Sequence, residues 1–147
     1  MPSQDPLVGF HFSLEISGTV TGYFSEVSGI GSENEVIENK VIGQDGHKEV
    51  IMKIPGRLKW ENIVLKRGIT ASMDMWVWRE AIIAGQIESN RKGGIIHMLN
   101  HEGAIVATWT FDRGWPVKVT GPSVKSDSNE IGVEEMTIAH EGTRRTL

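Results

Sequence analysis

The sequence predicts a mainly β fold: a small barrel or sandwich of antiparallel strands that carries one packed α-helix at about residues 72–87. Three observations predict it. Seventeen glycines and only five prolines in 147 residues indicate many turns between short strands. Apolar residues alternate with polar ones in several segments, which is the pattern of half-buried strands. One segment instead places its apolar residues at helical spacing.

The first half of the chain is expected to form strands and a hairpin. Alternation over residues 10–16 predicts the first strand, and YFSEVSGIG predicts a second strand that ends in glycines. Residues 33–42 and 48–54 are two further strand-like runs, and the GQDG between them is a hairpin turn signal. Pro55-Gly56 is predicted to form a type II turn, because proline fixes φ at the second turn position and glycine supplies the positive φ of the third.

The helix is expected over residues 73–87, with Ser72 as its N-cap and Asp74 in its first turn. Trp78 and Ile82 widen its apolar surface beyond one stripe. Such a helix is either a plain core helix or one that packs both on the sheet and on a neighbouring molecule. The apolar residues that define its spacing are Met73, Trp76, Val77, Ile83, Ala84 and Ile87.

The remaining segments are again strand-like. KWENIVLK predicts a strand before the helix, and alternation over residues 105–111 predicts one after it. Gly114-Trp115-Pro116 is expected to break the chain, and PVKVTG and NEIGVEEMTIAHE supply the last strands. No linker or repeat is visible, so a single domain is expected over residues 1–147, with a core at about 10–142 and short flexible termini.

Composition excludes several classes of protein. The net charge of −4 and the pI near 5.7 argue against a general nucleic-acid binder. No apolar run approaches the roughly 18 residues of a membrane span, and MPSQDPLVGF does not resemble a secretion signal. The absence of cysteine excludes disulfides and thiolate metal sites, and it fits synthesis in a reducing cytoplasm.

No catalytic, cofactor or metal site is predicted. His97 and His101 are four residues apart, but GGIIHMLNHEG reads as a strand that runs into a turn, where this spacing does not make a metal site. The pair Glu134-Glu135 is expected to be solvated surface rather than an acid–base pair. Neither a GxSxG motif nor a P-loop is present. The chain is therefore not expected to be an enzyme.

The charged residues suggest an interaction surface. Five of the fifteen basic residues lie between residues 52 and 70, beside the single aromatic Trp60. Three interpretations remain: complementarity with an acidic patch on another molecule, ordinary solvated charge, and nucleic-acid binding. Under the first interpretation the candidate interface consists of Glu33, Glu35, Glu38, Lys40, Asp45, Lys48, Glu49, Lys53, Arg57, Lys59, Lys66 and Arg67.

Five segments resemble, in content and order, the tail-tube family of contractile phage tails and bacterial contractile injection systems. They are FSEVSGI, KIPGRLKWENIVLKRGIT, MWVWRE, WTFDRGWPVKVTGPS and SNEIGVEEMTIAHEG, with Met136 and Ile138 in the apolar positions of the last. The resemblance covers roughly residues 10–142. It implies a structural subunit of the inner tube, with six copies per ring and rings stacked around a lumen that conducts cargo or DNA when the sheath contracts.

The resemblance also implies partners. These are further copies of the chain, a sheath protein outside, baseplate, spike and terminator proteins at the ends, and cargo, tape-measure protein or DNA in the lumen, without a direct membrane anchor. It implies synthesis in the bacterial cytoplasm and assembly into a phage tail or a tail-like particle that can be released.

The hairpin at residues 33–55 is expected to contact another subunit, because it is both apolar and charged. The alternative is a monomeric β-barrel that binds a small ligand in its interior.

Overall fold

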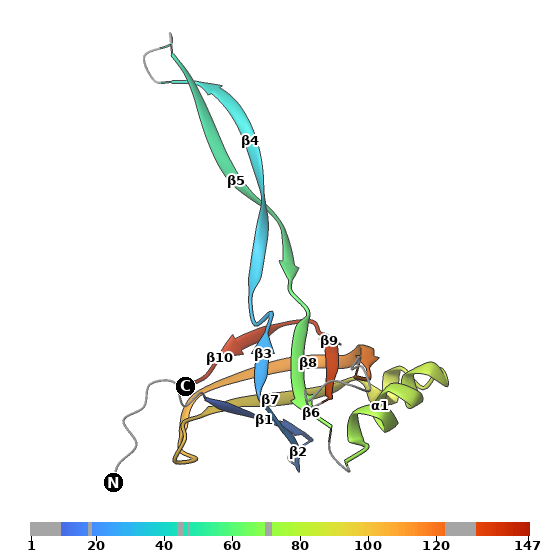
Figure 1. Cartoon of the computed structure of the whole chain (residues 1–147). Helices are drawn as coiled ribbons and strands as arrows, with labels where there is room; N and C mark the ends of the chain where they lie inside the picture. Colours follow the sequence, from blue (N-terminus) through green and yellow to red (C-terminus); the bar gives the residue numbers. More distant parts are fainter. Residues whose placement is uncertain (1–9, 18, 44–45, 47, 70–71, 123–131) are drawn as a thin grey trace. The chain divides into compact units, whose positions relative to one another are not determined.

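The computed structural model describes residues 10–17, 19–43, 46, 48–69, 72–122 and 132–147. The chain divides into two compact units, shown in Figure 1. The barrel unit is Met1–Ile30 with Asn62–Leu147, and the hairpin unit is Gly31–Glu61. In the part of the chain that is described, no helix is long and apolar enough to cross a membrane.

The barrel unit is an antiparallel sheet. Its described strands pair in the order β2-β1-β7-β8-β9-β6-β3, and β10 pairs with β8 off this path. The mainly β fold predicted from the sequence is confirmed. The strands are β1 (His11–Ile16), β2 (Thr19–Phe24), β3 (Glu26–Ser28), β6 (Ile63–Gly68), β7 (Lys92–Leu99), β8 (Ile105–Thr120), β9 (Val133–Ala139) and β10 (Thr143–Arg145).

Two features curve this sheet into a barrel: the short link between its end strands, and the pairing of β8 with two different neighbours. The end strands β2 and β3 are consecutive in the chain and separated only by Ser25, whose N–H donates to the Lys66 carbonyl oxygen at 2.9 Å. On the other side, β8 pairs with β7 through its first half and with β9 through its second half.

The bend in β8 lies at Arg113 and Gly114. Arg113 has a φ of 50°, and a Cβ on Gly114 would come within 2.4 Å of the Phe111 ring. The expectation that Gly114-Trp115-Pro116 breaks the chain is therefore wrong, because β8 continues through these residues. The sequence signal was real, but it marks a bent strand instead of a loop.

Apolar side chains fill the barrel interior. The alternation in β1, β6, β7 and β9 places one side of each strand inward, and six of these residues, Leu14, Ile63, Leu65, Ile96, Met136 and Ile138, are fully buried. A small barrel that is packed in this way holds its own side chains in place of a ligand. The interior therefore argues against a ligand-binding barrel.

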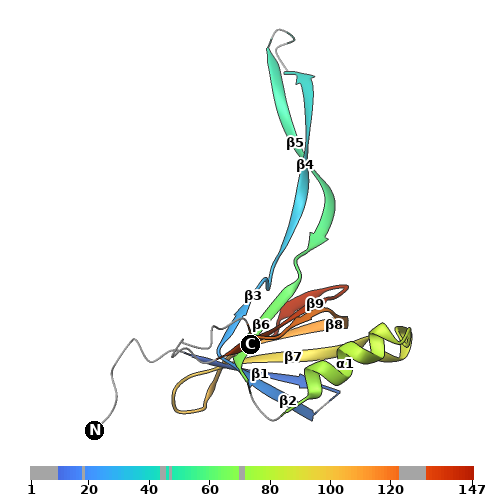
Figure 2. The ribbon, with the colours of Figure 1, turned by 45° about the vertical axis from the view of Figure 1, so that its right-hand side comes forward.

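The helix α1 (Asp74–Ile83) packs beside the barrel in Figure 2 and is followed by a short 3₁₀ turn, η1 (Glu88–Asn90). It is shorter than the expected 72–87. Met73 is the N-cap, and Ser72 lies one residue earlier, with its Oγ 3.5 Å from the Asp74 nitrogen, so the predicted Ser72 cap is wrong. Gly85, with a φ of 89°, ends the helix.

The buried face of α1 also differs from the expected one. Met75, Trp78 and Ile82 are buried, whereas Met73, Val77 and Ile83 are 61–67% exposed. The reason is that apolar residues occur on most sides of this helix, so their spacing selects no single face.

The hairpin unit is a twisted two-stranded ribbon of β4 (Ser32–Ile42) and β5 (Glu49–Trp60). This confirms the two predicted strand runs, and β5 continues beyond the expected end at residue 54. The predicted type II turn at Pro55-Gly56 is wrong, because both residues lie inside β5. Pro55 pairs with Val36 next to a register shift between Asn34 and Val36. A strand with only one neighbour tolerates a proline that cannot donate a hydrogen bond.

Candidate functional site

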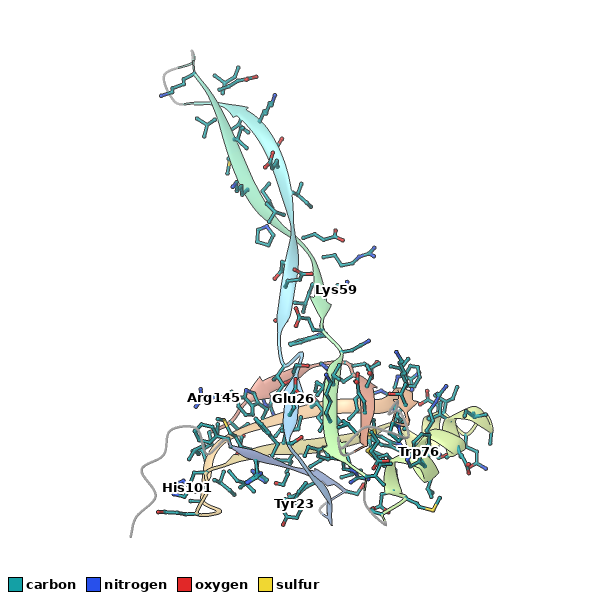
Figure 3. All side chains as sticks on the ribbon, in the orientation of Figure 1. Tyr23, Glu26, Lys59, Trp76, His101 and Arg145 are labelled. Carbon is teal, nitrogen blue, oxygen red and sulfur yellow. The ribbon has the colours of Figure 1, made fainter. Side chains whose placement is uncertain are left out.

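The hairpin has two different faces, which the strand register defines. Directly opposite residues share a face, and successive residues alternate between faces. Figure 3 shows side chains on both sides of the ribbon. The apolar face consists of Ile37, Asn39, Val41, Val50, Met52 and Ile54. The mixed face consists of Val36, Glu38, Lys40, Ile42, Glu49, Ile51, Lys53 and Pro55.

The apolar face is open to solvent. Ile37 is 52% exposed, Met52 49%, Val50 43% and Ile54 39%. A two-stranded hairpin is at best marginally stable in water, and contiguous exposed apolar residues mark interaction sites. The hairpin therefore has the properties of a segment that another molecule completes.

Opposite charges face each other along the ribbon. Glu38 lies opposite Lys53 on the mixed face, and Glu33 lies opposite Lys59 near the start of β4 and the end of β5. Such cross-strand pairs contribute roughly 0.2–1 kcal/mol each to strand pairing. These charges therefore help to fix the register of the hairpin in addition to any role in binding.

The structure brings most of the predicted interface residues together. Asp45 lies outside the described residues. Lys66 and Arg67 belong to β6 of the barrel unit, where the Lys66 amino group is 4.0 Å from a Glu26 carboxylate oxygen. Exposed positions on the hairpin are occupied by the other nine: Glu33, Glu35, Glu38, Lys40, Lys48, Glu49, Lys53, Arg57 and Lys59.

Arg67 corrects the predicted basic surface. Its side chain is buried, its Nε donates to Glu134 Oε1 at 2.8 Å, and its guanidinium lies 5.2 Å from the centre of the Phe24 ring. Trp76 Nε1 donates to the other carboxylate oxygen of Glu134 at 2.9 Å. Arg67 is thus paired inside the chain and is not part of an exposed patch. The expectation that Glu134 is solvated surface is wrong, because its side chain is buried.

The sequence did carry a signal for this buried pair. In IVLKRG, Arg67 is in phase with Ile63 and Leu65, and in VEEMTIA, Glu134 is in phase with Met136. Two opposite charges on the inward side of adjacent strands predict a buried ion pair, because an unpaired buried charge is too costly.

The histidines in the described part of the chain do not converge on a site. His97 Nδ1 is hydrogen-bonded to Thr108 Oγ1 at 2.9 Å, and its Nε2 lies 3.7 Å from Glu15. His101 lies 4.0 Å from Glu102 in the turn after β7. Among the described residues, no group of three or more histidine, aspartate or glutamate side chains is placed to hold a metal ion.

A packed barrel with a solvent-exposed apolar hairpin is typical of a subunit that binds another protein chain. Comparison with known proteins identifies the family. The chain matches the T4-like virus tail tube protein gp19 family over residues 8–144, and it belongs to this family. Since the family consists of structural tube proteins, the chain is a structural tail-tube protein and not an enzyme.

Solved structures agree with this assignment. A chain of the PVC sheath–tube complex, from an extracellular contractile injection system, is 25% identical with a TM-score of 0.76, over 96% of this chain and 90% of that one. A chain of the tube-terminating cap of the anti-feeding prophage is 26% identical with a TM-score of 0.75, over 92% and 87%. Hcp1 from Flavobacterium johnsoniae, at 14% identity and a TM-score of 0.55 over 92% and 94%, shares the fold. None of the curated proteins matches the chain.

Proposed function

We propose that this chain assembles into rings of six copies, and that the rings stack into the inner tube of a contractile tail or injection system. The observation that carries the proposal is the family match over residues 8–144. The exposed apolar face of the hairpin supports it, because a subunit that polymerises must present a surface for another copy to cover.

The partners follow from the same comparison. The similar chains come from a sheath–tube complex, a sheath and tube terminator, and a tube-terminating cap. A sheath around the tube, and terminator, baseplate and spike proteins at its ends, are therefore proposed partners here. The proposed lumen carries cargo, a tape-measure protein or DNA, and the assembled particle is a phage tail or an extracellular injection device made in the bacterial cytoplasm.

Within this assembly the hairpin is the proposed binding element. Its apolar face docks on another copy of the chain, and its charges set the register of the contact. The nine exposed charged residues on the hairpin remain the proposed interface together with Asp45 and the part-exposed Lys66, whereas Arg67 is excluded by its burial.

Electron microscopy tests the proposal directly. The purified chain, alone or mixed with its sheath and baseplate proteins, is expected to show rings or tubes, and light scattering is expected to give the mass of at least six subunits. A monomer mass at high concentration, with no rings in the presence of these partners, would refute the assembly function.

A further inference from the structure

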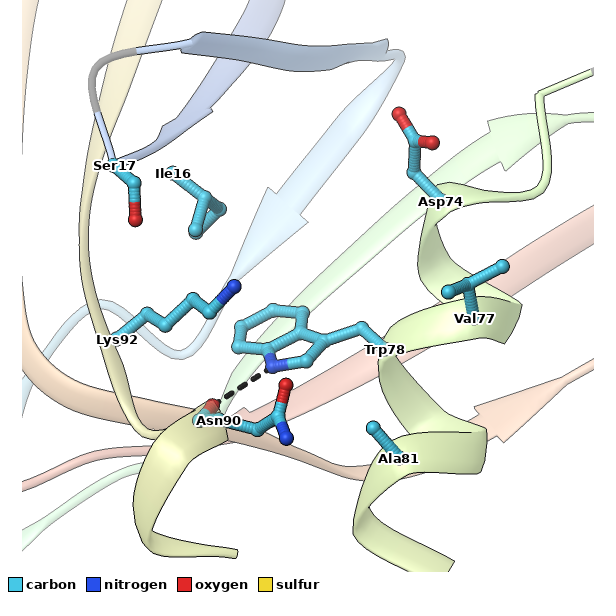
Figure 4. Close-up of a pocket in the computed structure, with 8 residues that line it drawn as sticks. All are labelled: Ile16, Ser17, Asp74, Val77, Trp78, Ala81, Asn90 and Lys92. Atoms are coloured by element: carbon cyan, nitrogen blue, oxygen red, sulfur yellow. Dashed lines mark hydrogen bonds between the residues drawn. The ribbon is translucent and has the colours of Figure 1, made fainter. Parts of the chain in front are cut away.

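A pocket of about 280 Å³ lies between α1 and the ends of β1 and β7. Figure 4 shows Trp78 at its centre, where the indole Nε1 donates to the Asn90 carbonyl oxygen at 2.8 Å. This hydrogen bond and the burial of Trp78 hold the indole ring in place. The lining residues are Ile16, Ser17, Asp74, Val77, Trp78, Ala81, Asn90 and Lys92.

The pocket combines an apolar wall with two opposite charges. Ile16, Val77 and Trp78 supply the apolar wall, and Figure 4 shows Lys92 and Asp74 on different sides of the indole. Among the described residues, no ion pair is found for Lys92 or Asp74. The pocket therefore offers apolar contact together with one positive and one negative charge, which is the combination that side chains of a protein partner can match.

The tip of the hairpin carries the complementary pattern on its mixed face. Lys40 lies opposite Ile51, and Ile42 lies opposite Glu49. The two isoleucines therefore occupy one diagonal of a square, and Lys40 and Glu49 occupy the other. Ile42 is 71% exposed and Ile51 is 54% exposed. We call these four residues the tip square.

We propose that the tip square of one copy docks in the α1 pocket of a second copy. Ile42 and Ile51 cover the exposed Val77 and the edge of Trp78, Glu49 faces Lys92, and Lys40 faces Asp74. The inference rests on the proposed tube assembly and adds to it the pair of surfaces that meet. The two surfaces are different and every subunit carries both, so the contact can be made head-to-tail and propagate from copy to copy, which is the arrangement that the proposed tube requires.

Cysteine cross-linking tests the pairing, because the chain has no cysteine of its own. Subunits with Ile51→Cys are mixed with subunits with Ala81→Cys, assembled and oxidised. A disulfide dimer is expected on a non-reducing gel, since the two residues would come within bonding range. Val50→Cys is the matched control: it is the next residue in β5 but lies on the other face, and its dimer yield with Ala81→Cys is expected to be at least about tenfold lower.

Charge reversal gives an independent readout. Glu49→Lys and Lys92→Glu are each expected to raise the concentration needed for half-maximal assembly about fivefold, and the double variant is expected to return to within about twofold of the parent. Circular dichroism verifies that each variant is folded. Failure of the double variant to recover, or equal cross-linking from Ile51→Cys and Val50→Cys within tubes that do form, would overturn the pairing and leave the tube function intact. A parent chain that forms no rings with any partner would overturn both.

Discussion

The strands of the barrel unit and of the hairpin unit both carry alternating apolar residues, but only the barrel unit buries them. In β6 the alternating residues Ile63 and Leu65 are fully buried against the neighbouring strands. In β4 and β5 the comparable residues Ile37 and Met52 are about half exposed. The barrel is stabilised by its own side chains, whereas the hairpin leaves its apolar residues about half exposed to solvent.

This difference separates two kinds of mutational effect. A change in the barrel interior should alter the free energy of unfolding of the isolated chain. A change on the apolar face of the hairpin should alter assembly and leave that free energy nearly unchanged, because the face buries little in a single chain. The predictions below test this separation, starting with the largest effect.

Glu134→Ala is expected to lower the free energy of unfolding by about 3–5 kcal/mol. The substitution leaves the buried Arg67 without its carboxylate and removes the acceptor of the Trp76 indole N–H. Urea unfolding followed by circular dichroism measures the change. The matched control is Glu135→Ala, the next residue, which points to the other side of β9 and is half-buried.

The control is expected to cost less than about 1 kcal/mol, the usual value of an exposed or partly exposed charge. If both alanine substitutions lower the free energy of unfolding equally, the buried Arg67–Glu134 pair does not stabilise the barrel more than an exposed charge does.

Ile37→Asp is expected to reduce tube formation by more than about tenfold while it changes the free energy of unfolding by no more than about 1 kcal/mol, the value of a lost cross-strand pair. The charge would have to be buried against the neighbouring copy, whereas in the free chain it stays in contact with water, because Ile37 is 52% exposed. Sedimentation of tubes and urea unfolding measure the two quantities on the same sample.

Ile105→Asp is the matched control: it makes the same change at a residue of the barrel unit that is 47% exposed, and it should assemble like the parent. If Ile37→Asp forms tubes as readily as the parent, the apolar face is ordinary surface and the contrast between the two units fails.

Alternation predicted the barrel well because period-two burial is a local property of each strand. Residues 10–16 and 105–111 were read correctly as strands, and the helix was found near its true position. The pattern could not predict which face of the helix packs against the barrel. Trp76 and Val77 fit the predicted helical stripe, yet the barrel is packed against Met75 and Trp78.

The hairpin shows a different limit. Its strands were predicted, but Pro55-Gly56 has the composition of a turn and lies within a strand. Local turn chemistry gave the wrong answer there, because the strand pairing extends past the proline across a register shift. The charged residues of the candidate interface are predicted from composition alone. The register of β4 against β5 is needed to tell which of them share a face with apolar residues.

Gly56→Val is expected to disturb the hairpin locally by roughly 1–2 kcal/mol. A Cβ on Gly56 would lie 3.0 Å from the Glu35 carbonyl oxygen and 3.1 Å from the Ile37 side chain, so the cause is close approach and not a positive φ. Amide hydrogen exchange should become faster across β4 and β5 and stay unchanged in β6 and β9. Faster exchange throughout the barrel would show that the two units do not behave as separate parts.

The smallest predicted effect concerns exposed charges of the barrel unit. A hydrogen bond from Arg113, at 3.1 Å, is the main cause that lowers the pKa of Glu88, and Arg113 also binds Glu141. A carboxyl whose folded pKa is lowered stabilises the fold above its unfolded pKa, and this contribution is lost as the pH falls through the lowered value. Arg113→Ala should therefore move the pKa of Glu88 upward toward its ordinary range, which an NMR titration of the side-chain carboxyl measures. Because both side chains are well exposed, stability above this pH range should change little, in contrast to Glu134→Ala. An unchanged Glu88 titration in Arg113→Ala would mean that another group holds the carboxylate.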